Sequence, residues 1–146
     1  YIEMVGEGEL VEIPGVNQLF RDLRGKGIGV ALTSGFPRRI VDSIINALNW
    51  RGDIDLSVAS DEVDHGRPAP DMILRSITHY ETLRQKRISS DSIIVVGDTE
   101  SDMKAAYAAR AKFIVGVTSG AHTQDELLAN GATHVFESAP EIVALL

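Results

Sequence analysis

Short apolar runs alternate with longer segments of helical periodicity along most of the 146-residue chain. The clearest run, residues 93–96 (Ile-Ile-Val-Val), is β-branched and unalternated, which is typical of a strand buried on both faces of a parallel sheet. Similar runs predict further strands at residues 28–32, 54–59 and 113–117, and a last short strand at 134–136. These spacings leave room for a helix between successive strands.

Apolar residues recur at helical spacing in the intervals between the predicted strands. The first helix follows Pro14 and is closed by Gly25 and Gly27. The other predicted helices follow Pro37, cover residues 71–87, include the alanine-rich segment 105–109, cover residues 124–129 and begin again at Pro140. Strands that alternate with helices predict an α/β fold with a doubly wound parallel sheet.

Residues 1–13 differ from the rest of the chain because they show neither a helical nor a strand period. Glutamates alternate there with Gly6, Gly8 and scattered aliphatic residues. We therefore expect a linker or the end of a missing segment at 1–13, followed by one domain over 14–146. The chain begins at Tyr1, so we also expect it to be a processed or partial piece of a longer protein.

Charge and composition narrow the classes of function. The net charge of −7 argues against a general nucleic-acid binder, which needs a basic face. The absence of cysteine excludes disulfides and thiolate metal sites and fits a cytoplasmic protein. No apolar run approaches the roughly 18 residues that a membrane span needs, so we expect no membrane association.

Two carboxylates follow the apolar run 93–96 directly. Asp98 stands where the strand should end, and Asp102 comes four residues later, in the first turn of the next predicted helix. Ligands of open α/β sheets bind beyond the carboxyl ends of the strands. The pair is therefore predicted to hold a hard cation such as Mg²⁺, with Asp98 as a direct ligand and Asp102 either ligating through water or orienting Arg67. The alternative is that Asp98 only caps the helix that begins near Glu100.

Two other predicted loops carry groups that bind anions. Ser34 offers a hydroxyl after the strand at 28–32, and Gly35 and Phe36 offer backbone N–H groups before a helix. Arg67 stands in the polar loop 60–70, and its guanidinium is a strong partner for phosphate oxygens. Taken one at a time, Ser34 also fits a helix cap and Arg67 a surface residue. Together with a metal carboxylate, they describe a phosphoryl-transfer site.

Three of these segments resemble motifs of the haloacid dehalogenase-like (HAD-like) hydrolases, a superfamily of aspartate-nucleophile phosphatases. Residues 32–35 (Leu-Thr-Ser-Gly) are similar to the second motif, 66–71 (Gly-Arg-Pro-Ala-Pro-Asp) to the third and 96–102 (Val-Gly-Asp-Thr-Glu-Ser-Asp) to the fourth. The segment 116–120 looks like the end of phosphoglycolate-phosphatase-type members. Thr-Ser-Gly-Phe together with Gly-Arg-Pro is closest to the phosphonoacetaldehyde hydrolase (phosphonatase) branch. The resemblance covers residues 14–146.

The resemblance implies a Rossmann-like core and a role for each matched residue. Ser34, Gly35 and Arg67 are expected to bind phosphate, and Ser34 and Arg67 to act in catalysis. Asp98 and Asp102 are expected to hold Mg²⁺, the implied cofactor. Residues 1–13 then correspond to a linker or the end of a missing cap segment.

The first motif of the family, Asp-x-Asp-Gly-Thr after an apolar strand, does not occur in this sequence. Its first Asp attacks phosphorus in the family, and its second acts as acid and base. Asp53-Ile54-Asp55 is a poor substitute, because it follows Trp50-Arg51-Gly52 and no Gly-Thr comes after it. We therefore expect a core that lacks the strand carrying the nucleophile, with that strand in an absent upstream segment, on a second chain, or lost. The 146 residues alone are expected to be inactive.

The function that these residues predict is Mg²⁺-dependent hydrolysis of a small phosphorylated metabolite. Phosphonate hydrolysis is the second hypothesis; in the family it uses a Schiff-base lysine of the cap, which would lie in the absent part. A homodimer is compatible with either. A non-catalytic Mg²⁺- or phosphate-binding remnant is an alternative of another class. A serine hydrolase using Ser34 or Ser119 with a histidine such as His122 lacks the Gly-x-Ser-x-Gly elbow.

Overall fold

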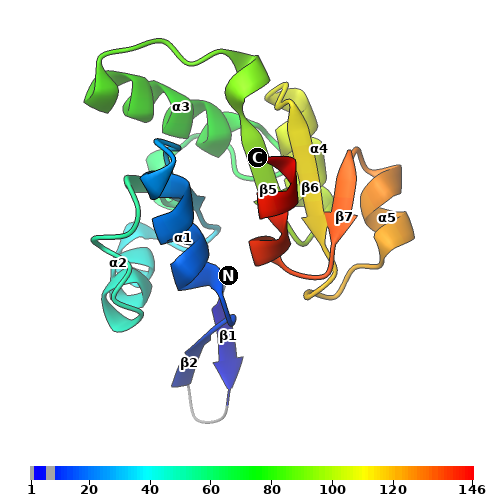
Figure 1. Cartoon of the computed structure of the whole chain (residues 1–146), viewed down its shortest axis with the longest axis horizontal. Helices are drawn as coiled ribbons and strands as arrows, with labels where there is room; N and C mark the ends of the chain where they lie inside the picture. Colours follow the sequence, from blue (N-terminus) through cyan, green and yellow to red (C-terminus); the bar gives the residue numbers. More distant parts are fainter. Residues whose placement is uncertain (1, 6–8) are drawn as a thin grey trace. The chain divides into compact units, whose positions relative to one another are not determined.

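The computed structural model describes residues 2–5 and 9–146, with side chains from residue 13 onward. It consists of two compact units, Tyr1–Glu62 and Val63–Leu146, and Figure 1 labels their α-helices and most of their strands. None of the described helices combines the length and hydrophobicity that crossing a bilayer requires.

The first unit begins with an antiparallel pair of strands, β1 (Ile2–Val5) and β2 (Glu9–Glu12), in which Ile2 lies opposite Glu12. The sequence pattern predicted no regular structure here, and for these two segments that prediction was wrong. Strand pairing depends on the partner segment as well as on the hydrophobic period of each segment. The imperfect alternation of apolar and polar residues in 1–13 therefore gave no sign of the hairpin. Gly6 and Gly8, on which part of that prediction depended, lie outside the described residues. The role of 1–13 as a linker or the end of a cap stays a prediction.

The rest of the first unit is a small α/β arrangement. Helix α1 (Val16–Gly25) precedes β3 (Ala31–Thr33), and α2 (Arg38–Ala47) leads to β4 (Leu56–Val58) and the short 3₁₀ helix η1 (Ser60–Glu62). β3 and β4 pair in parallel, with Ala31 opposite Leu56.

Buried apolar side chains from several elements stabilise this unit. Trp50 and Phe20 meet edge to face with ring centroids 5.1 Å apart, and both side chains are buried. The helices contribute apolar stripes to the same core, as the sequence period predicted: Val16, Leu19, Phe20 and Leu23 from α1, and Val41, Ile44 and Ile45 from α2.

The second unit contains a three-stranded parallel sheet in the order β5–β6–β7. Its strands are β5 (Ile94–Gly97), β6 (Phe113–Val117) and β7 (His134–Phe136), drawn side by side in Figure 1. The helices of this unit are α3 (Asp71–Arg84), α4 (Glu100–Ala108), α5 (Gln124–Ala129) and the 3₁₀ helices η2 (Ser90–Ser92) and η3 (Ala139–Leu145). Parallel pairing in both units confirms the predicted α/β class.

The core of this unit lies between the sheet and the helices α4 and α5. Met103 and Ala106 of α4, Leu127 of α5 and Ile114 of β6 form one buried cluster. Gly116 is part of this packing, because a Cβ built there would lie 2.9 Å from Leu127 Cδ1. Small side chains therefore bring α4 and α5 close to the sheet, as the alanine-rich segment predicted.

The structure differs from the predicted pattern in two places in this unit. The predicted strand at 93–96 was expected to be buried on both faces, whereas Ile94, Val95 and Val96 are only half-buried. Within the described residues β5 is an edge strand that pairs with β6 alone, so one side of it receives no neighbouring strand. The predicted terminal helix is a 3₁₀ helix, Ala139–Leu145, rather than an α-helix.

Candidate functional site

The site in the second unit is built where β5 meets α4. Gly97 ends the strand, Asp98 follows it, and Thr99 caps the helix by accepting a hydrogen bond from the Asp102 backbone N–H at 3.1 Å. In turn, the Asp102 carboxylate accepts a hydrogen bond from the backbone N–H of Thr99, which completes a capping box. The residue that caps the helix is therefore Thr99. The alternative in which Asp98 is only a helix cap was wrong.

Asp102 uses both of its carboxylate oxygens inside the protein. Its Oδ2 accepts from the backbone N–H groups of Asp98 and Thr99, each at 3.1 Å, and from the Thr99 hydroxyl at 2.9 Å. Its Oδ1 accepts from Arg67 Nη1 at 2.5 Å. Gly97 leaves the space for this carboxylate, because a Cβ built there would be 2.4 Å from the Asp102 Cβ. The carboxylate thus joins the strand end, the helix cap and the Arg67 loop.

The pair between Arg67 and Asp102 is largely withdrawn from water. The side chains are 27% and 9% exposed respectively. Within the described residues only Nη1 of Arg67 donates a hydrogen bond, so Nη2 and Nε are left to donate to an anion. Of the two predicted roles for Asp102, the geometry favours the one in which it orients Arg67.

Asp98 is held differently from Asp102. Its own burial, followed by the nearby Asp102 carboxylate, raises the pKa of Asp98 above its ordinary value. Gly120, in the segment after β6, lies against it: a Cβ built at Gly120 would be 2.3 Å from Asp98 Oδ2. A half-buried carboxylate beside a second one is stabilised by a nearby cation, so the donor set fits Mg²⁺ held by Asp98.

Ser34 and Gly35 lie in the first unit, after β3. The Ser34 N–H donates to the carbonyl of Val58 at 3.1 Å, and Ser34 Oγ accepts from the N–H of Phe36 at 3.1 Å. The Phe36 N–H, which was predicted to be a donor for an anion, therefore donates to a side chain of its own loop. Arg38 fixes the end of this loop, because its guanidinium donates to the Ser57 carbonyl and hydroxyl, each at 2.8 Å.

The predicted site residues thus fall into two sets. The structure brings Arg67, Asp98 and Asp102 together within the second unit, while Ser34 and Gly35 belong to the first. Sequence reasoning missed the packing roles of Gly97 and Gly120, for which the only signal was a glycine next to a predicted strand end.

Residues 53–55 (Asp-Ile-Asp), the segment that only superficially resembles the first motif, have a structural role. Asp55 Oδ2 accepts from the Val30 N–H at 2.7 Å, and Asp53 lies 3.4 Å from Arg21 Nε. These contacts join the loop before β4 to the strand region before β3 and to α1. They agree with the sequence interpretation of a loop leading into a strand.

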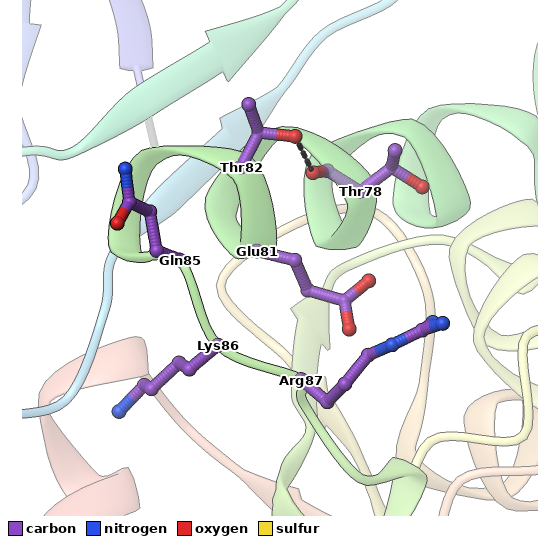
Figure 2. A pocket seen from close by; sticks show the side chains of 6 residues that line it. All are labelled: Thr78, Glu81, Thr82, Gln85, Lys86 and Arg87. Carbon is purple, nitrogen blue, oxygen red and sulfur yellow. Dashed lines mark hydrogen bonds between the residues drawn. The ribbon is translucent and has the colours of Figure 1, made fainter.

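A shallow pocket of about 350 Å³ lies at the carboxyl end of α3, and Figure 2 shows the side chains around it. They come from α3 and the residues just after it: Thr78, Glu81, Thr82, Gln85, Lys86 and Arg87. Some of their polar groups already have partners, since Thr82 Oγ1 donates to the Thr78 carbonyl and Glu81 accepts from the Ile88 N–H. None of the predicted site residues lines this pocket.

The chain matches a known family of hydrolases and several of its members. Residues 1–116 match the model of the haloacid dehalogenase-like hydrolase family, a range that includes Ser34, Arg67, Asp98 and Asp102. The phosphonoacetaldehyde hydrolase of Bacteroides fragilis is 27% identical over 158 residues, which cover 92% of this chain and 58% of that protein. The bifunctional riboflavin kinase/FMN phosphatase of Arabidopsis thaliana is 30% identical over 138 residues, 92% of this chain and 32% of that protein.

Solved structures show the same fold. A crystal structure of a Thermotoga maritima protein assigned as a β-phosphoglucomutase superimposes with a TM-score of 0.83 at 24% identity, covering 94% of this chain and 62% of that one. The chain therefore spans less than two thirds of the length of these relatives. Because the family model covers most of the chain, the chain belongs to the haloacid dehalogenase-like hydrolase family.

Proposed function

We propose that this chain is part of a Mg²⁺-dependent phosphatase that acts on a small phosphorylated metabolite. The observation that carries the proposal is the Arg67–Asp102 pair beside Asp98, because it places a guanidinium with free donors next to a carboxylate suited to a divalent cation. Two of the relatives support the reaction class, since their names describe a phosphonoacetaldehyde hydrolase and an FMN phosphatase.

Each residue of the chain has a defined task in this proposal. Arg67 donates through Nη2 and Nε to phosphate oxygens, and Asp102 holds the guanidinium in place. The Ser34 hydroxyl and the Gly35 backbone N–H are assigned to phosphate binding as well. Asp98 would hold Mg²⁺, which when bound supplies positive charge close to the phosphate oxygens.

The attacking carboxylate is expected from a segment outside these 146 residues, either upstream or on a second chain. Ser34, Arg67 and Asp98 bind and polarise a phosphate ester, but none of them is an aspartate placed for in-line attack. Covalent catalysis by an aspartate divides hydrolysis into formation and breakdown of an acyl phosphate. A homodimer remains compatible with this arrangement.

A phosphonatase activity is the second candidate, and the similarity to phosphonoacetaldehyde hydrolase supports it. The two reactions differ in the bond that breaks, O–P in an ester and C–P in a phosphonate. An imine between substrate carbonyl and a lysine would make the phosphonatase sensitive to borohydride in the presence of substrate. A phosphatase acting on an ester has no such sensitivity.

The test uses the full-length protein with Mg²⁺ and a set of phosphorylated sugars, FMN and phosphonoacetaldehyde, with phosphate release as the measurement. Arg67→Ala should lower kcat/KM more than Ser34→Ala, because a charge-assisted hydrogen bond is worth roughly twice a neutral one. His79→Ala, an exposed change on α3, serves as the control. Absence of phosphate release from every substrate, with Mg²⁺ and phosphate still bound, would favour the non-catalytic alternative instead.

A further inference from the structure

Three side chains that the proposed function does not use converge in the second unit. Glu100 is the first residue of α4, His122 lies between β6 and α5, and Glu126 is in α5. One metal-ligating atom from each of the three lies within 4.8 Å of the corresponding atoms of the other two. Glu100 and His122 are half-buried, and Glu126 is exposed.

The three side chains are available for a ligand. Within the described residues, the two carboxylates and the imidazole make no side-chain hydrogen bond or ion pair, although the neighbouring Asp102 makes four. His122 Nδ1 is shielded from solvent and has no hydrogen-bond partner among the described residues. A shielded ring nitrogen normally has a partner, and an ion is one of the few groups that can supply it.

The cap of α5 does not use the Glu126 carboxylate. The segment Thr-Gln-Asp-Glu, residues 123–126, has the pattern of a capping box, in which Glu126 would accept from the Thr123 N–H. Only the other half of the box forms, since Thr123 Oγ1 accepts from the Glu126 N–H at 3.3 Å. The Glu126 carboxylate instead lies with Glu100 and His122, where two like charges repel each other unless a cation is present.

We propose that Glu100, His122 and Glu126 bind a divalent first-row transition metal such as Zn²⁺ or Mn²⁺. An imidazole with two carboxylates suits such ions, whereas Mg²⁺ prefers oxygen ligands alone. Three protein ligands leave coordination positions for water. This site is separate from the Mg²⁺ site proposed at Asp98 and does not depend on the proposed function.

A metal here would stabilise the segment that flanks the Asp98 carboxylate. His122 stands two residues after Gly120, whose Cα approaches Asp98 so closely that a Cβ would be 2.3 Å from Oδ2. The metal would join this segment to the start of α4 through Glu100. Occupancy is therefore expected to restrict the motion of the loop beside Asp98.

The test is a titration of tag-free, full-length protein with Co²⁺ and with Zn²⁺ in the presence of excess Mg²⁺. Co²⁺ reports its ligands through visible absorption bands, and calorimetry gives the Zn²⁺ affinity. The variants are His122→Ala and Glu126→Gln. Their matched controls are His79→Ala, an exposed histidine of the same unit, and Asp125→Asn, the exposed neighbour of Glu126. Asp98→Asn separates this site from the Mg²⁺ site.

The proposal requires one equivalent of metal, bound by the wild type, by both controls and by Asp98→Asn. His122→Ala and Glu126→Gln should weaken binding by more than about tenfold, since even outer partners of metal ligands cost roughly 10–100-fold when changed. Unchanged affinity in either folded variant overturns the site. Absence of binding to the wild type also overturns it. Glu126→Gln decides the matter if His122→Ala does not fold.

Discussion

Replacing Asp102 separates the two structural tasks of its carboxylate. In Asp102→Asn, the amide oxygen takes the place of Oδ2 and keeps the bonds to the Asp98 and Thr99 N–H groups. The amide nitrogen then faces Arg67 Nη1, so a donor meets a donor. In Asp102→Ala, the cap and the ion pair are both lost.

The expected losses follow from the burial of the pair. A hydrogen bond to a charged group contributes about 1.5–3 kcal/mol, which sets the cost of Asp102→Asn. Removing one partner of a buried ion pair costs about 3–5 kcal/mol, which sets the cost of Asp102→Ala, since Asp102 is 9% and Arg67 27% exposed. With a urea dependence of ~2 kcal/mol per M, the unfolding midpoint should fall by roughly 1 M for Asn and 2 M for Ala.

The assay is urea unfolding of the full-length protein followed by circular dichroism, with Asp64→Asn as the exposed control. Amide hydrogen exchange adds a local measurement: exchange at Asp98 and Thr99 should accelerate in Asp102→Ala and change little in Asp102→Asn. If the Asn variant were as unstable as the Ala variant, or if both were as stable as the control, the division of tasks described above would be wrong.

Two glycine substitutions test the close approaches in the second unit. Gly120→Ala places a methyl group 2.3 Å from Asp98 Oδ2 and should weaken Mg²⁺ binding, as measured by calorimetry. An unchanged Mg²⁺ affinity would mean that Asp98 is not a ligand of the metal. Gly116→Ala places one 2.9 Å from Leu127 Cδ1 and should destabilise the fold by about 1–3 kcal/mol in thermal unfolding. Gly25→Ala, with open space around it, is the control for both, and equal behaviour of all three variants would contradict the packing.

The sequence predicted those parts of the site that depend on local chain geometry. Asp98 and Asp102 are four residues apart across a strand end and the first helical turn, so their proximity follows from the backbone. Thr99 was not predicted as the cap, although Thr before a helix with an acidic residue three positions later is a known signal. The orientation of Arg67 by Asp102 was one of two roles expected for Asp102, and the sequence pattern could not choose between them because 35 positions separate the two residues.

Contacts between residues far apart in the sequence could not be predicted from the hydrophobic pattern. Glu100 and His122 stand 22 positions apart, and they meet because α4, β6 and the following segment fold back on one another. No short motif connects these residue types at that spacing. The approach of Gly120 to Asp98 has the same origin, and a glycine in a predicted loop looks the same whether it packs closely or only turns the chain.

The unpaired edges of the two parallel sheets bear on the expectation that a strand carrying the nucleophile is missing. Within the described residues β3 pairs only with β4, and β5 only with β6, so each has one side without a neighbouring strand. The apolar residues of β5 are half-buried, although an unalternated apolar run is typical of a strand paired and covered on all sides. Unpaired backbone groups at such an edge are satisfied by adding a strand. These same two strands carry Ser34 and Asp98 just beyond their carboxyl ends. A nucleophile-bearing strand that paired in parallel with β5 would therefore bring its own carboxyl end next to Asp98.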